Sequence, residues 1–195
     1  MRYLTDEEAL RLMNAAPAEL RSLIAAALLT GCRYQELARL RPADVDLPAG
    51  VLTVPVAKGG SPRTVLLTAE ALAFFGGAMA GKEGHAVLFP RANGAAWGKS
   101  HQFRPLRQAR KAVRITPAIS FRILRHTHAS RLAMRGVPIA VIAAQLGHSD
   151  IKLTQRHYAH LSPGYVADTI RAAFGNLGVT YVTNVVPAHV REAVG

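Results

Sequence analysis

Residues 51–67 read VLTVPVAKGGSPRTVLL, and this stretch decides the fold class. Val51–Val54 and Thr64–Leu67 are short runs of β-branched and aliphatic residues on either side of a glycine-rich turn that carries Lys58. Such a pair predicts a β-hairpin. The segment Asp44–Asp46 adds an expected third strand. Because the flanking sequence has helical periodicity, we expect an α+β fold, mainly α-helical, with a small antiparallel three-stranded sheet.

The residues before the hairpin predict three helices. Thr5-Asp6-Glu7-Glu8 has the spacing of a capping box, which starts a helix. A second helix is expected over Ala18–Thr30, where apolar residues recur on one side. Gly31 interrupts it, and a short helix is expected over Arg33–Leu40.

The chain returns to helix after Thr68. A loop rich in Gly, Pro and Asn is expected over Phe89–Gly98. The further expected helices cover about Ser100–Val113, Ser120–Met134, Pro138 to near Gly147, and the region of Tyr158.

The charge balance points to a polyanionic partner. The 195 residues contain 24 Lys and Arg against 12 Asp and Glu, a formal net charge of +12. Such an excess is typical of proteins that bind nucleic acid or an acidic membrane surface. The single cysteine, Cys32, suits a reducing compartment, and the acidic N-terminus does not read as a signal peptide. We therefore expect a soluble, cytoplasmic protein.

Four separated segments carry chemically active residues. They are TGCRYQEL at 30–37, Lys58 in the hairpin, LRHT at 124–127, and LGH at 146–148 with YAH following at 158–160. Taken singly each is weak, because an isolated Arg is usually a surface group and an isolated Tyr usually packs in a core. Their order and spacing together carry more information.

In that order the segments resemble the catalytic domain of the tyrosine recombinase, or phage integrase, family. That family shows an Arg in T-G-x-R-x-x-E-L, a Lys on a β-hairpin, a helix reading H-x-L-R-H-T, and L-G-H about ten residues before the nucleophilic Tyr. The resemblance runs from about Leu4 to Arg171. It implies the DNA breaking-rejoining enzyme fold, also called the integrase catalytic core.

The resemblance assigns roles that the chemistry of phosphodiesters supports. Arg33 and Arg125 form the expected phosphate clamp, because guanidinium groups stay charged and hold pairs of oxygens. Glu36 has an expected supporting role in orienting Arg33 or a neighbour, and an ordinary surface pair is the alternative. Tyr158 is the expected nucleophile, Lys58 the acid that protonates the departing 5′ oxygen, and His148 a hydrogen-bond donor to the phosphate.

One position departs from the family pattern. The family's first histidine, three residues before Arg125, is replaced by Arg122. An arginine donates to phosphate but does not act as a base. We expect reduced but not abolished activity, so that Arg122→His should cleave faster, and no gain would refute this expectation. The alternative is that Arg122 only contacts DNA.

A metal site is the other chemistry that the histidines suggest. His126 with His128, or His157 with His160, are candidate ligands, but no Asp or Glu lies among them and we expect no metal. His126 is instead expected to bond backbone, and His157 and His160 to flank the helix of Tyr158. Trp97 is expected to pack in the core or against DNA.

The predicted function is site-specific DNA integration or excision through a 3′-phosphotyrosyl intermediate. The expected partners are double-stranded DNA and further copies of the chain in a tetramer, without a cofactor, small-molecule ligand or membrane. Residues 1–175 form the expected catalytic domain, without the family's N-terminal core-binding domain, and 176–195 an exchanged or flexible tail. The alternatives are a non-catalytic DNA-binding protein with a degenerate recombinase fold, and a type IB topoisomerase.

Overall fold

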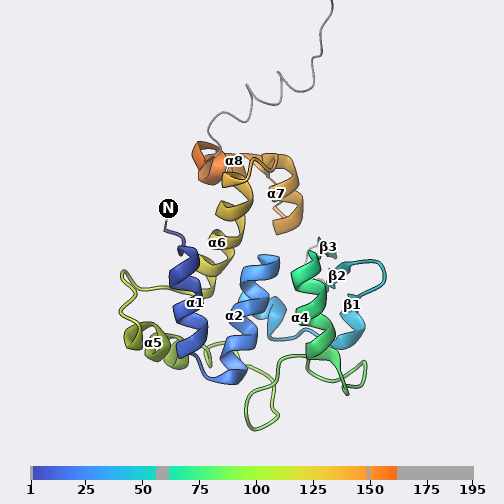
Figure 1. Cartoon of the computed structure of the whole chain (residues 1–195). Helices are drawn as coiled ribbons and strands as arrows, with labels where there is room; N and C mark the ends of the chain where they lie inside the picture. Colours follow the sequence, from blue (N-terminus) through green and yellow to red (C-terminus); the bar gives the residue numbers. More distant parts are fainter. Residues whose placement is uncertain (1, 56–61, 149, 162–195) are drawn as a thin grey trace, which may run out of the picture. The chain divides into compact units, whose positions relative to one another are not determined.

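The computed structural model describes residues 2–55, 62–148 and 150–161, and these form the expected α+β fold (Figure 1). In chain order the elements are α1 (Asp6–Ala15), α2 (Ala18–Thr30), α3 (Tyr34–Leu37), the 3₁₀ turn η1 (Pro42–Asp44), β1 (Val45–Asp46), β2 (Val51–Val54), β3 (Arg63–Leu66), α4 (Ala69–Met79), α5 (Phe103–Ala112), α6 (Phe121–Met134), α7 (Ile139–Leu146), α8 (Ile151–Tyr158) and the 3₁₀ turn η2 (Ala159–Leu161).

The sheet has the order β1-β2-β3 and is antiparallel throughout. Leu52 pairs with Val65 across the hairpin, and both side chains are fully buried. The second hairpin strand begins at Arg63, one residue earlier than expected, because Arg63 pairs with Val54. The register therefore turns Leu52, Val54 and Val65 toward the core, while Leu66 on the opposite face is exposed.

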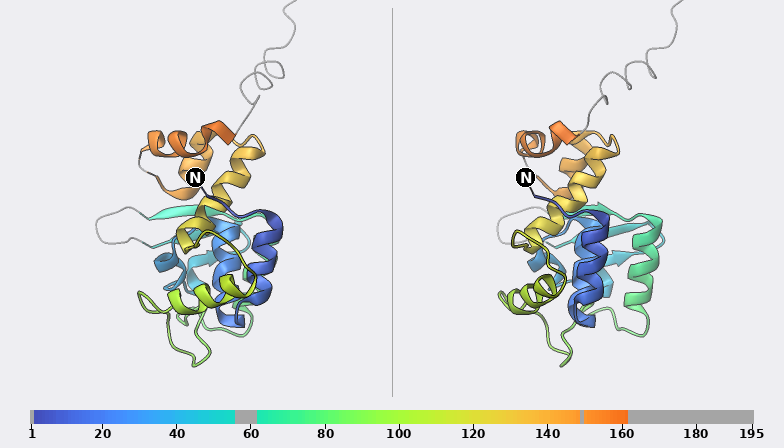
Figure 2. Two further views of the ribbon diagram at one scale, coloured as in Figure 1. Left: turned by 90° about the vertical axis from the view of Figure 1, so that its left-hand side faces the viewer. Right: turned by 60° about the vertical axis from the view of Figure 1, so that its left-hand side comes forward.

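Helix α2 lies at the centre of the main core. Leu20, Leu23 and Ile24 have no exposed surface. The helix contacts α1, α4 and α6, and Figure 2 shows α1 and α2 side by side. It ends at Gly31, whose φ of 68° is left-handed, and a Cβ there would lie 2.8 Å from carbons of His128 and Leu146. Only glycine fits at this end of α2.

A second, smaller core joins the end of the described chain to α6. It contains Ala129 and Ala133 of α6, Ile142 and Leu146 of α7, and Tyr158 of α8. Figure 1 shows α7 and α8 together at the end of α6 that lies farthest from α5. This small core fixes the α8 segment against the rest of the described chain.

Two expected helices are shorter in the structure. The helix expected over Arg33–Leu40 covers only Tyr34–Leu37, since the Leu40 carbonyl accepts from the N–H of Leu88. The basic helix begins at Phe103, which places Pro105 in its first turn, where a missing N–H costs little. The capping box of Thr5 and Glu8 is confirmed. Among the described residues no helix is both long and apolar enough to cross a membrane.

Candidate active site

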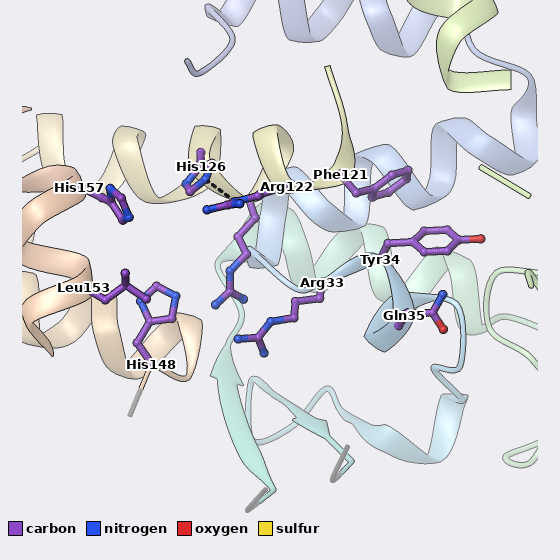
Figure 3. Close-up of a pocket in the computed structure, with 10 residues that line it drawn as sticks. Arg33, Tyr34, Gln35, Phe121, Arg122, His126, His148, Leu153 and His157 are labelled. Atoms are coloured by element: carbon purple, nitrogen blue, oxygen red, sulfur yellow. Dashed lines mark hydrogen bonds between the residues drawn. The ribbon is translucent and has the colours of Figure 1, made fainter. Parts of the chain in front are cut away.

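Three of the predicted cationic side chains meet in one pocket. The cavity measures about 450 Å³, and Figure 3 shows the side chains of Arg33, Arg122 and His148 directed toward one another from three separate segments. Within the described part of the chain its lining holds no carboxylate. It consists of Arg33, Tyr34, Gln35, Phe121, Arg122, Arg125, His126, His148, Leu153 and His157. A pocket with this lining suits an anion that offers several oxygens.

Arg125 is the buried arginine of the pocket, and backbone carbonyls hold its guanidinium in place. One nitrogen donates to the Gly31 carbonyl at 2.8 Å, and the other donates to the Leu146 carbonyl at 2.7 Å. Burial, with smaller contributions from Arg33 and Arg63, lowers the pKa of Arg125 to about 10, so the side chain is charged at neutral pH. The structure thus ties the TGCR and LGH segments together through this arginine.

Arg33 stands at the mouth of the pocket, and Glu36 orients it. The guanidinium donates to Glu36 Oε1 at 2.9 Å, and the Arg33 backbone N–H donates to Oε2 at 2.6 Å. Because the Arg33 side chain is 53% exposed, this ion pair leaves it open to a ligand. The orienting role predicted for Glu36 therefore has the geometry that it requires.

Arg63 is a residue that the sequence reasoning missed. Its guanidinium donates to Glu36 Oε2 at 2.7 Å and to the Gln145 carbonyl at 3.2 Å. It does not line the pocket but joins β3 to α3 and α7. Its position could have been noticed, because Arg63 directly follows the predicted hairpin turn that contains the candidate residue Lys58.

His148 follows the left-handed Gly147 and reaches the pocket from the α7–α8 segment. Its Nδ1 lies 2.7 Å from the Thr154 hydroxyl, which fixes the ring. Burial and the charges of Arg125, Arg33 and Arg63 lower the pKa of His148 to about 4. The imidazole is therefore neutral at physiological pH and retains one N–H for hydrogen bonding.

Tyr158 adjoins the pocket but does not line it. Its side chain is 1% exposed and belongs to the small core. Its phenolic oxygen lies 2.5 Å from Nδ1 of His126, a residue that does line the pocket. His157, one residue earlier on α8, lines the pocket instead. Burial raises the pKa of Tyr158 to about 12, against the opposing charges of Arg125 and Arg122.

The expectation that His126 bonds backbone is wrong. Its two ring nitrogens contact side chains, since Arg122 Nε donates to Nε2 at 3.3 Å and Nδ1 meets the Tyr158 oxygen. The reason is that residues 122 and 126 lie one turn apart on α6 while α8 packs against the same face. Burial and neighbouring cations, Arg122 first among them, lower the pKa of His126 to about 4.

Two predicted parts of the protein lie outside the described residues. They are Lys58 of the hairpin turn and the tail at 176–195. Among residues 2–55, 62–148 and 150–161, no three His, Cys, Asp or Glu side chains gather as metal ligands. His128, one of the candidate ligands, instead uses Nδ1 on the Leu28 carbonyl at 2.9 Å.

The sequence and the fold match known recombinases. Residues 2–164 match the model of the phage integrase family. The tyrosine recombinase XerC of Xanthomonas campestris pv. campestris is 33% identical over 178 residues, covering 87% of this chain and 54% of XerC. The XerA recombinase structure superposes with a TM-score of 0.70 at 27% identity, over 90% of this chain and 66% of XerA.

A third likeness extends the fold comparison. The Tn1549 transposon integrase, solved in complex with a circular intermediate DNA, gives a TM-score of 0.71 at 20% identity, over 88% of this chain and 65% of that one. The fold is that of tyrosine recombinase catalytic domains, and the chain belongs to the phage integrase family. It spans about half the length of curated relatives such as XerC.

Proposed function

We propose that this protein binds double-stranded DNA and recombines it at specific sites, breaking and rejoining strands through a covalent link to Tyr158. The observation that carries the proposal is the convergence of Arg33, Arg122 and Arg125 in one pocket beside the helix that bears Tyr158. The net charge of +12 favours a polyanionic substrate.

The pocket supplies what phosphoryl transfer needs. Arg33 and Arg125 bind the non-bridging oxygens of the scissile phosphate, and Arg122 and His148 add hydrogen bonds as charge develops on it. The phenolic oxygen of Tyr158 attacks phosphorus, the bond to the 5′ oxygen breaks, and that oxygen gains a proton, for which we propose Lys58. Reversal with a second 5′ hydroxyl rejoins the strand, so the bond energy is kept in the phosphotyrosine.

Attack requires a change in the α8 segment. In the described structure Tyr158 does not line the pocket: its phenolic oxygen contacts His126, and His157 lines the pocket instead. The segment must therefore shift so that the phenolic oxygen leaves the small core and reaches the phosphate while it stays within hydrogen-bond reach of His126, which lines the pocket. We further propose that four copies act on two duplexes, and that they do so in the cytoplasm, which suits the free thiol of Cys32.

The test is a covalent trap that works without a known target sequence. A library of nicked duplexes with randomised sequence is incubated with the protein, and complexes that survive SDS are collected, sequenced and digested for mass spectrometry. We expect a DNA adduct on Tyr158, a shared sequence among the trapped duplexes, and no adduct with Tyr158→Phe. Salt-sensitive DNA binding without any adduct would support the non-catalytic alternative instead.

A further inference from the structure

We propose that Arg122 and His126 form a hydrogen-bond relay that presents an N–H donor to the phenolic oxygen of Tyr158. In this relay His126 is a catalytic residue, because it touches the attacking atom, and Arg122 is a positioning residue that acts through His126. The inference rests on Tyr158 being the nucleophile of the proposed reaction.

The Arg122 end of the relay sets the tautomer of the imidazole. Arg122 Nε lies 3.3 Å from His126 Nε2. A guanidinium nitrogen can only donate, so Nε2 must accept with its lone pair. A neutral imidazole that accepts at Nε2 carries its proton on Nδ1. Arg122 therefore selects the Nδ1–H form of His126.

At the other end of the relay, the Nδ1–H of His126 donates a hydrogen bond to the phenolic oxygen of Tyr158. Nδ1 lies 2.5 Å from the phenolic oxygen, and the rings of His126 and Tyr158 are 5.9 Å apart between centroids. A donor at a phenolic oxygen stabilises the phenolate more than the phenol. The polarity is opposite to that of a serine-hydrolase triad, where a carboxylate turns the histidine into an acceptor for the nucleophile's proton.

The surroundings keep His126 neutral, as the relay requires. Arg122 and Arg125 from α6, His157 from α8 and His148 after α7 all oppose a positive charge on the ring, in addition to its burial. A protonated His126 would also direct an Nε2–H against the Arg122 N–H. The imidazole is thus arranged to donate to Tyr158 and not to remove its proton.

The relay fits the balance of the cleavage step. The bond between the phenolic oxygen and phosphorus forms and the bond from phosphorus to the 5′ oxygen breaks. The phenolic proton passes to solvent water, and the 5′ oxygen gains a proton, for which Lys58 is the proposed donor. His126 keeps its own proton throughout. Its contribution is the hydrogen bond that offsets part of the cost of forming the phenolate.

The tautomer can be measured without DNA. In protein labelled with ¹⁵N-histidine, the ring nitrogen shifts of His126 report which nitrogen bears the proton. We expect Nδ1–H in the wild type and a shift toward Nε2–H in Arg122→Met. His128 is a matched internal control, because its Nδ1 bonds the Leu28 carbonyl. An Nε2–H wild-type ring, or an unchanged tautomer in Arg122→Met, would overturn the relay.

The catalytic role is tested on a trapped substrate under single-turnover conditions. We expect His126→Phe, which keeps a ring but has no donor, to form adduct roughly 10- to 100-fold more slowly. His126→Asn, whose amide restores a donor, should recover part of the rate. Unchanged adduct formation in His126→Phe would refute the relay, whereas no adduct in the wild type would refute the proposed function itself. Arg122→His is unsuitable here, since it removes the guanidinium and adds a proton-transfer group together.

Discussion

The side chain of Arg63 occupies the space into which a Cβ on Gly147 would project. Gly147 has a φ of 68°, and its neighbour Arg63 is held by Glu36 and by the Gln145 carbonyl. Glycine is therefore needed at position 147 for two reasons: the backbone is left-handed there, and the Arg63 side chain leaves no room for a Cβ.

Gly147→Ala should destabilise the protein more than its backbone angle alone explains. The matched control is Gly50→Ala, since Gly50 has a φ of 69° with no atom within 4 Å of the added Cβ. We expect Gly147→Ala to cost roughly 1–3 kcal/mol more than Gly50→Ala, because Arg63 must move. Urea unfolding of both variants measures the difference, and equal losses would contradict the close packing.

Glu36 and Arg63 should be energetically coupled. Their 2.7 Å ion pair is mostly buried, with 13% of each side chain exposed. We expect Glu36→Gln and Arg63→Met each to destabilise the fold, and the double variant to lose less than the sum. A double-mutant cycle on unfolding free energies should give a coupling of roughly 0.5–3 kcal/mol. Additive losses would mean that the pair contributes nothing beyond its separate contacts.

Arg125→Lys should impair folding and cleavage together. A lysine keeps the charge but cannot bond the Gly31 and Leu146 carbonyls at the same time. We expect a lower unfolding temperature and adduct formation slowed by roughly 100- to 1,000-fold, the range for loss of one preorganised donor. Arg33→Lys is the comparison, since Arg33 is 53% exposed and should slow cleavage without a comparable loss of stability.

Stability should fall as the pH drops from about 6.5 toward 4. The fold lowers the pKa of His126 and of His148 from 6.5 to about 4, so between these values the unfolded chain binds more protons than the folded one. The unfolding free energy therefore rises with pH across this window and levels off above it. Urea titrations at several pH values measure the slope, which His126→Asn should reduce. A flat profile would show that neither ring is held neutral.

The sequence predicted the architecture because the signals for it are local. The capping box at Thr5, the pairing of β2 with β3, and the glycines at 31 and 147 depend on residues close in sequence, and each appears within one residue of where it was expected. The helix after Arg33 was overestimated because its end depends on Leu88, which is distant in sequence.

The site was predicted only in part, because the direction in which a helix side chain points within the fold depends on tertiary packing. The sequence grouped Arg33, Arg125 and His148, and the structure brings them to one pocket. Neighbouring residues of a helix point about 100° apart, however, so whether His157 or Tyr158 meets the pocket depends on how α8 packs. The contacts of Arg63 and the side-chain partners of His126 likewise depend on which elements meet.

Arg125 has a consequence for interpreting related sequences. Its two carbonyl bonds join the end of α2 to the end of α7, so the guanidinium that lines the pocket also holds together the segments around it. A descendant that had abandoned strand cleavage would still need this side chain to stay folded. A related sequence that retains this arginine therefore shares the fold, but it need not share the activity. Evidence of activity must come from residues that the fold depends on less, such as the exposed Arg33.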